Sequence, residues 1–454
     1  MQLICEDEVQ ETPYGPLPAH WRVMPLEQCA VVQTGVAKGR KIDSDDMVTV
    51  PYLRVANVQD GYLDLSEIKE ITIRRSEVDR FALQGGDVLL TEGGDFDKLG
   101  RGFLWHSQIP GCVHQNHIFA VRSKRELLDP EFLAYLIQSS YGKGYFLSVA
   151  HKTTNLACIN TTKLKALPTP IPPKSEQRTI ANILHIVQRA KDAAEAVVVA
   201  ARRFKQSLLR HLFTYGPVPF DQTNLVDTVP VQVGEVPASW RLCTLGELLR
   251  EGSGDIQSGP FGSQLHASDY KTSGVPVVNP THLGFNEIVD QDIPRINQDD
   301  ANRLDRHYLQ EGDVLIARRG DFSRFSYITN QNAGWLCGTG CIRIRISHGR
   351  VDSRFLGLSF STDRIQNYLR DHSVGTIMPN LNGKIVAALP ICLPSLPEQE
   401  QIVESLLKMD DKIRAEESRV SALGVLFTTL LRDLMTGRVR VHDLDLPILT
   451  GGGS

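Results

Sequence analysis

The sequence predicts an α+β protein in which two similar globular domains alternate with two long helices. The sequence contains an internal repeat: residues 17–22 (LPAHWR) are similar to residues 236–241 (VPASWR), and GDVL occurs at 86–89 and again at 312–315. A repeat of roughly 200 residues is too long for a solenoid unit, so it indicates a duplicated pair of domain and helix. Such a chain presents two similar surfaces, which suits a two-fold symmetric target such as a DNA duplex.

The composition is that of a globular protein with more than one domain. The 454 residues are 41% hydrophobic and 22% charged, with a net charge of −4, and a chain of this length exceeds what one core supports. The sequence contains no run of about 18 apolar residues, so we expect no membrane span. The N-terminus has no apolar signal-peptide stretch. The 8 cysteines are scattered and form no Cys-x-x-Cys pair, which predicts reduced thiols and a cytoplasmic protein.

Two stretches of about 40 residues each have the pattern of a single long helix, about 60 Å in length. The first follows PPKSEQ and has no proline or glycine until Gly216, and the second follows PSLPEQ and ends at Gly437. Ser175 is the expected N-cap of the first helix, and glycine is a usual C-terminal stop. Each helix carries an apolar stripe, formed by Ile180, Leu184, Val187, Ala194, Val198, Ala201, Leu208 and Leu212 in the first and by Ile402, Leu406, Met409, Ile413, Val420, Leu423, Phe427, Leu430 and Leu434 in the second.

The two stripes predict an antiparallel coiled coil. Basic residues outnumber acidic ones in the first helix, and the reverse holds in the second, which favours pairing of one helix with the other over self-pairing. The link at 214–235 is short, so the second helix must return towards the start of the chain. The alternative is that each helix packs along its own globular domain.

These patterns divide the chain into seven parts. Each globular domain mixes short β-like runs (52–55, 87–90 and 118–121; 275–278, 313–316 and 341–344) with helical patterns near 129–138 and 353–371. Asp87 and Asp313 each follow a glycine, and we expect both to have a structural role in a turn. The predicted order is an N-terminal arm (1–16), a first globular domain (17–173), a first long helix (174–215), a linker (216–235), a second globular domain (236–396), a second long helix (397–437) and a tail (438–454), whose final GGGS resembles an artificial linker.

The loops between the strands differ most between the two halves, and they carry the candidate DNA-binding residues. Basic and amide side chains can donate to purine edges and phosphates, and carboxylates can accept from cytosine. The alternatives are that loops of duplicated domains drift freely, or that the acidic run 92–97 or the pair of His114 and His117 holds a metal ion. The candidates are Lys38, Arg40, Lys41, Glu92, Lys98, Arg101, His114, Gln115 and Asn116 in the first domain and Ser263, Gln264, Arg318, Arg319, Arg324 and Thr339 in the second.

The doubled order of domain, Pro-x-x-Glu-Gln or Pro-Glu-Gln motif and long helix resembles the specificity subunit of type I restriction–modification systems. The runs EGGD at 92–95 and SGPFGS at 258–263 are similar to motifs frequent in the family's target-recognition domains, and TTNL at 153–156 is similar to the approach to its first conserved helix. The resemblance extends from residue 17 to residue 438.

The resemblance implies two target-recognition domains, each of which binds one half of a split site in double-stranded DNA. It also implies that the paired helices act as a spacer and hold two modification subunits, which methylate adenine with S-adenosylmethionine. A restriction subunit that needs ATP and Mg²⁺ would join them in a complete system, and this chain itself would hold no cofactor or metal. The alternatives are the specificity chain of a fused nuclease–methylase system and a coiled-coil scaffold that does not read DNA.

No motif in the sequence supplies catalysis. The run NPTH at 279–282 departs from the Asn-Pro-Pro-Tyr type of methyltransferase motif at its third and fourth residues. Neither a Gly-x-Gly-x-x-Gly turn after a strand nor a phosphate-binding loop of the Gly-x-x-x-x-Gly-Lys-Ser/Thr type occurs. We therefore expect a chain that is not an enzyme by itself.

Overall fold

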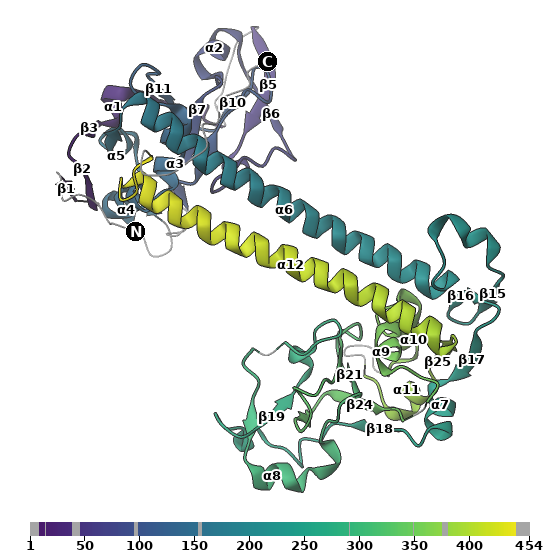
Figure 1. Ribbon diagram of the computed structural model, residues 1–454. Helices are drawn as coiled ribbons and strands as arrows, with labels where there is room; N and C mark the ends of the chain where they lie inside the picture. The colour runs from purple at the N-terminus through teal and green to yellow at the C-terminus, as the bar shows by residue number, and fades with distance from the viewer. Residues whose placement is uncertain are drawn as a thin grey trace. The chain divides into compact units, whose positions relative to one another are not determined.

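The computed structural model describes residues 9–13, 15–38, 46–94, 99–152, 157–289, 291–347, 349–374 and 380–441 (Figure 1). They form two compact units: unit 1 lies within residues 1–195 and 417–454, and unit 2 within 196–416. The two long helices, α6 (Lys174–Tyr215) and α12 (Leu396–Met435), each belong partly to both units. Each unit is therefore a globular domain together with one end of each long helix.

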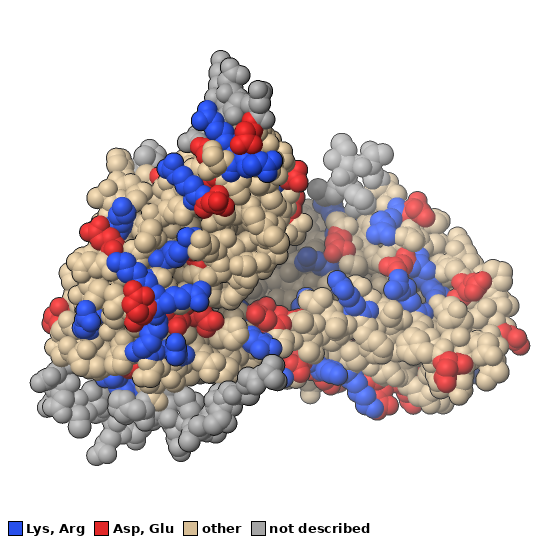
Figure 2. Space-filling model, turned by 90° about the horizontal axis from the view of Figure 1, so that it is seen from above, with Lys and Arg blue, Asp and Glu red and all other residues tan. Residues whose placement is uncertain are grey.

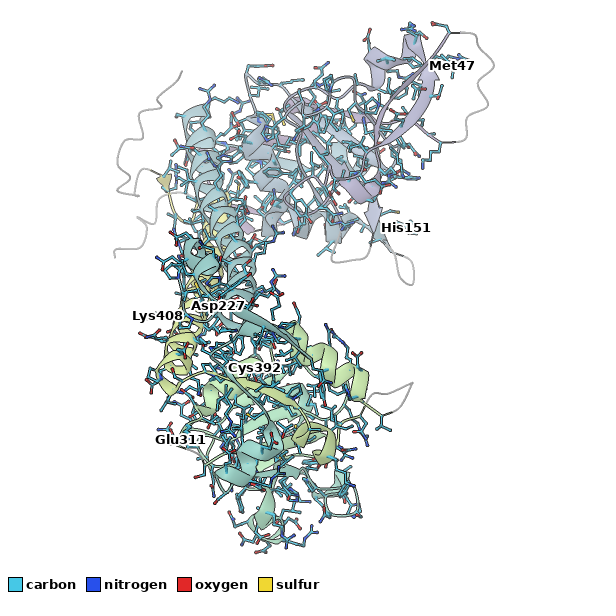
Figure 3. All side chains as sticks on the ribbon, turned by 90° about the vertical axis from the view of Figure 1, so that its right-hand side faces the viewer. Met47, His151, Asp227, Glu311, Cys392 and Lys408 are labelled. Atoms are coloured by element: carbon cyan, nitrogen blue, oxygen red, sulfur yellow. The ribbon has the colours of Figure 1, made fainter. Side chains whose placement is uncertain are left out.

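Unit 1 is built on a four-stranded antiparallel sheet in the order β4-β11-β7-β9. A three-stranded sheet, β10-β5-β6, lies next to it in the fold, and Met47 of β5 and His151 of β12 mark well-separated edges of the unit (Figure 3). The strands are β1 (Val9–Thr12), β2 (Gly15–Pro18), β3 (Arg22–Pro25), β4 (Ala30–Thr34), β5 (Met47–Leu53), β6 (Lys69–Arg74), β7 (Asp87–Thr91), β8 (Gly93–Gly94), β9 (Gly102–Leu104), β10 (Val113–His114), β11 (Ile118–Ser123), β12 (His151–Lys152), β13 (Ala157–Cys158) and β14 (Pro168–Ile171), and the main helices are α3 (Pro130–Gln138), α4 (Ser140–Val149) and α5 (Thr161–Lys165).

Unit 2 repeats this topology, which confirms the predicted duplication and the α+β class. Its four-stranded sheet has the order β18-β24-β21-β22, and its three-stranded sheet has the order β20-β19-β23. The strands are β15 (Thr228–Val231), β16 (Gly234–Pro237), β17 (Arg241–Thr244), β18 (Asp255–Ser258), β19 (Val275–Val278), β20 (Arg295–Ile296), β21 (Val314–Ala317), β22 (Phe325–Tyr327), β23 (Leu336–Cys337), β24 (Cys341–Arg345) and β25 (Pro390–Leu393), and the main helices are α7 (Leu245–Glu251), α8 (Gln298–Arg303), α9 (Ser353–Ser359), α10 (Asp363–His372) and α11 (Gly383–Ala387).

The long helices pair in the antiparallel sense that the sequence predicts. In unit 1 the start of α6 packs with the end of α12, and Leu184 and Leu434 are both fully buried in the same core cluster. In unit 2 the end of α6 packs with the start of α12, and Leu212 shares a core cluster with Leu406. Lys205 of α6 forms an ion pair with Asp410 of α12, as the opposite charge balance of the two helices leads one to expect.

A buried glutamine at the start of each long helix explains why the Glu-Gln motif occurs twice. The Gln177 side chain accepts from the Asp129 N–H at 2.7 Å and donates to the carbonyls of Leu127 and Pro172, both at 2.9 Å. Gln399 makes the same three bonds with Asp352, Arg350 and Pro394, at 2.8, 2.9 and 3.0 Å. Each glutamine thus ties a long helix to the loop that begins the short helix, α3 or α9.

The two GDVL segments also have one structural role, as expected for Asp87 and Asp313. Both carboxylates are buried, and each receives two hydrogen bonds of 2.7 Å from an arginine on the neighbouring strand, Arg122 or Arg345. Each also accepts from the N–H of the residue three positions before it. The preceding glycines have φ of 99° and 90°, a conformation that glycine adopts at little cost.

Unit 1 is closed by residues that follow α12. Gly437 has φ of 66°, and an added Cβ there would collide with Pro18. Arg440 binds the buried Glu176 through Nε at 3.1 Å and Nη2 at 2.9 Å, and the Trp21 indole N–H donates to the same carboxylate at 3.3 Å. The first domain therefore completes its core with the end of the second helix.

One prediction about the helices was wrong. Ser175 is not the N-cap of the first helix, because α6 already begins at Lys174. The helical pattern predicted near 353–371 is confirmed, and it comprises two helices, α9 and α10, separated by a turn at residues 360–362. Thr362 lies at the N-cap position of α10 and is buried, and its hydroxyl donates to the Ser359 carbonyl at 2.7 Å within this turn.

Candidate nucleic-acid interface

The backbone brings the predicted loops together at the same place in each domain. In unit 1 the Glu92 N–H donates to the His117 carbonyl at 2.9 Å, and in unit 2 the Arg318 N–H donates to the Gly340 carbonyl at 2.7 Å. In each unit, the loop that follows β7 or β21 thus meets the turn that precedes β11 or β24. We call these two places the loop junctions of unit 1 and unit 2.

The loop junction of unit 1 carries a chain of polar side chains. Glu92 Oε2 lies 2.6 Å from His117 Nδ1, and Asn116 Nδ2 lies 3.4 Å from His117 Nε2. Gln115 accepts from the Val55 N–H at 3.3 Å. His117 was not among the DNA-binding residues predicted from the sequence, although it belongs to the run HQNH that supplied the other three.

Two further candidates of unit 1 lie on neighbouring segments. Lys38 is exposed, with its Nζ 5.7 Å from the centre of the Tyr52 ring. Arg101 donates to Gln59 Oε1 at 3.2 Å. Arg40, Lys41 and Lys98 lie outside the described residues.

His114 is not at the surface of the folded domain. The prediction that it contacts DNA was therefore wrong. The two-residue strand β10 turns its ring into the interior, where it is fully buried. Cys337 occupies the matching position on β23 and is buried as well. A run of polar residues gives no sign of which side chain faces inward, because strand alternation cannot be read where every residue is polar.

The burial of His114 should make unit 1 sensitive to acid. Burial lowers the pKa of His114 to about 4, whereas an unperturbed histidine titrates near pH 6.5. Between these two pH values, His114 binds a proton in the unfolded chain but not in the folded domain. The free energy of unfolding of unit 1 should therefore fall by about 3 kcal/mol as the pH drops from about 6.5 to 4. Urea unfolding at several pH values measures this slope.

The replacement His114→Cys, which copies the residue in unit 2, should remove this part of the pH dependence whatever its effect at pH 7. An unchanged slope in the variant would assign the acid sensitivity to other groups.

The loop junction of unit 2 is organised around Arg318. Its Nε donates to Asn380 Oδ1 at 3.1 Å and to the Leu381 carbonyl at 3.3 Å. The guanidinium lies over the Phe261 ring, 5.4 Å from its centre, and that ring is 56% exposed. Phe261 was absent from the predicted residues, although it stands in the run SGPFGS that the sequence singles out.

The other candidates of unit 2 are exposed. Arg319 and Thr339 flank the same junction in sequence and have exposed side chains. Arg324 is paired with Asp321 at 3.4 Å. Ser263 and Gln264 lie on the exposed loop after β18, where the Gln264 amide oxygen accepts from the Phe261 N–H at 3.1 Å.

Charges of both signs are mixed on one face of the protein (Figure 2). On the face seen in Figure 2, Lys and Arg are intermingled with Asp and Glu, in keeping with the net charge of −4. Within the described ranges, no group of three His, Cys, Asp or Glu side chains is placed to hold a metal ion. No helix among the described residues is long and apolar enough to cross a membrane.

Comparison with solved structures shows a shared fold. The S subunit of a type I restriction–modification system from M. genitalium has a TM-score of 0.53 at 16% identity, over 93% of this chain and 99% of that chain. A chain from a structure of type I R-M complex assembly and conformational transition has a TM-score of 0.58 at 18% identity, with the same coverage of 93% and 99%.

Sequence comparisons agree along the whole length. The MjaVIII specificity subunit of Methanocaldococcus jannaschii is 22% identical over 98% of this chain and 99% of its own length. The StySPI specificity subunit of Salmonella potsdam is 24% identical over 95% of this chain and 93% of its own. The model of the type I restriction modification DNA specificity domain matches twice, at residues 18–196 and 242–423. Because this family model matches two segments that together cover most of the chain, each a globular domain with part of a long helix, the chain belongs to the family of type I restriction–modification DNA specificity proteins.

Proposed function

We propose that this chain is the DNA sequence-specificity subunit of a type I restriction–modification complex and reads a split site in double-stranded DNA. The observation that carries the proposal is the duplicated specificity domain, which keeps one backbone arrangement at both loop junctions. The side chains at those junctions differ: Glu92, Asn116 and His117 in unit 1, and Arg318 and Thr339 in unit 2. One scaffold with two sets of polar groups suits two different half-sites.

The chemistry of the complex is proposed to belong to partner subunits. Two modification subunits would dock on the two pseudo-symmetric ends of the helix pair, since a duplicated surface offers two similar sites. They would methylate adenine with S-adenosylmethionine, and a restriction subunit would join where the system has one. This chain would select the sequence and position the partners without catalysing a step.

Methylation-aware sequencing of host DNA tests the proposal. We expect a motif of two short half-sites with a constant gap, methylated only in cells that carry this chain together with its modification partner. The purified chain alone should transfer no labelled methyl groups to DNA. A chain that neither binds duplex DNA in the purified complex nor changes the methylated motif would be a scaffold, and one that methylates alone would contradict the division of labour.

A further inference from the structure

Glu92 and Arg318 occupy the same backbone position in the two domains. Glu92 follows Thr91, which pairs with Ile118, and Arg318 follows Ala317, which pairs with Cys341. Beyond the N–H bonds that define the loop junctions, the Glu92 carbonyl accepts from Ile159 and the Arg318 carbonyl from Leu381, both at 2.9 Å. The duplication therefore places an acidic and a basic side chain at matched points of the two proposed reading surfaces.

In each of these side chains, one atom of the charged group takes part in hydrogen bonds within the domain. The other polar atoms of the group remain available to a ligand. Glu92 is 32% exposed and is held through Oε2 by His117, 2.6 Å away. Among the described residues Oε1 has no hydrogen-bond partner, so this oxygen is available as an acceptor.

Arg318 has the complementary arrangement. Asn380 and the Leu381 carbonyl occupy Nε, and the ring of Phe261 supports the guanidinium plane. Within the described part of unit 2 the two terminal Nη nitrogens bind no other side chain. An arginine held at Nε and supported on an aromatic ring presents its two Nη donors in a fixed direction, which lowers the entropy lost on binding.

We propose, on the basis of the proposed function, that this shared position reads a base in both half-sites, with opposite hydrogen-bonding polarity. Arg318 donates from Nη1 and Nη2 to O6 and N7 of a guanine in the half-site of unit 2. Glu92 accepts from the N4 amine of a cytosine in the half-site of unit 1. Major-groove edges of these two bases present acceptors and a donor respectively, so the two side chains match them and reject each other's base.

The test selects duplexes from a randomised library with the full chain in complex with its modification subunits. Arg318→Gln should shift one guanine position of the unit 2 half-site towards adenine, because a glutamine amide matches adenine N6 and N7. Glu92→Gln should relax one cytosine position of the unit 1 half-site. In each case we expect discrimination at that single position to fall by about 5- to 150-fold.

Two exposed residues serve as matched controls, because each removes the same charge from the same unit. Arg250→Gln on α7 and Glu126→Gln in the loop before α3 should leave both half-sites unchanged. Circular dichroism melting of each variant verifies that it folds.

Each outcome is informative. A wild-type complex that selects a split sequence, together with variants that alter one position of their own half-site, supports the inference. If Arg318→Gln weakens binding to all sequences equally, the arginine contacts phosphate and the inference fails, while the proposed function stands. A folded Glu92→Gln variant with unchanged preferences overturns the assignment in unit 1. A wild-type complex that selects no sequence would overturn the proposed function itself.

Discussion

Replacing Leu406 with proline should unfold unit 2 while unit 1 stays folded. Leu406 is fully buried and lies in the core cluster of the second domain. Proline in a helix interior costs about 3 kcal/mol or more, and loss of a buried leucine adds about 2–5 kcal/mol. From the sequence alone one would expect both globular domains to survive this change, but the structure makes the start of α12 part of the second domain.

Hydrogen-exchange mass spectrometry resolves the two units. We expect lost protection throughout 196–416 and retained protection in the first domain, together with loss of the complex with modification subunits on size-exclusion chromatography. Leu406→Met is the control, because a volume-conserving change usually costs less than about 1.5 kcal/mol. Retained protection in the second domain of the proline variant would show that α12 is not part of its core.

Removing the Asp313 carboxylate should also destabilise unit 2 strongly. Asp313→Ala leaves Arg345 without the two 2.7 Å bonds that it makes to the carboxylate. Breaking one partner of a buried pair costs about 3–5 kcal/mol, and we expect the lower end because Arg345 remains 26% exposed. Urea unfolding measures the change, and Asp87→Ala should produce the matching loss in unit 1.

The control for this variant is Asp321→Ala. Asp321 is 54% exposed and also pairs with an arginine, Arg324, and exposed pairs contribute about 0–1 kcal/mol. If Asp313→Ala and Asp321→Ala lowered the free energy of unfolding equally, burial of the pair of Asp313 and Arg345 would not add to its stabilising effect.

The sequence predicts the features that the chain repeats. The GDVL segments, the Glu-Gln motifs and the helix stripes occur twice, and each proves to be structural: a buried ion pair, a buried amide or a helix interface. Features that depend on contacts distant in sequence were beyond prediction. The anchor of Arg318 is Asn380, 62 residues away, and no local pattern connects them. The inward orientation of His114 follows from a two-residue strand within an all-polar run, where periodicity carries no signal.

The closure of unit 1 by Arg440 and the end of α12 has a consequence for the order of biosynthesis. Residues 196–416 are contiguous, so the second domain and its helix ends can assemble as soon as they leave the ribosome. The first domain, although translated earlier, must wait with an incomplete core until Leu434, Met435 and Arg440 emerge. Its apolar surface stays open to chaperones and to aggregation during that interval. The half that is made first is the half that matures last.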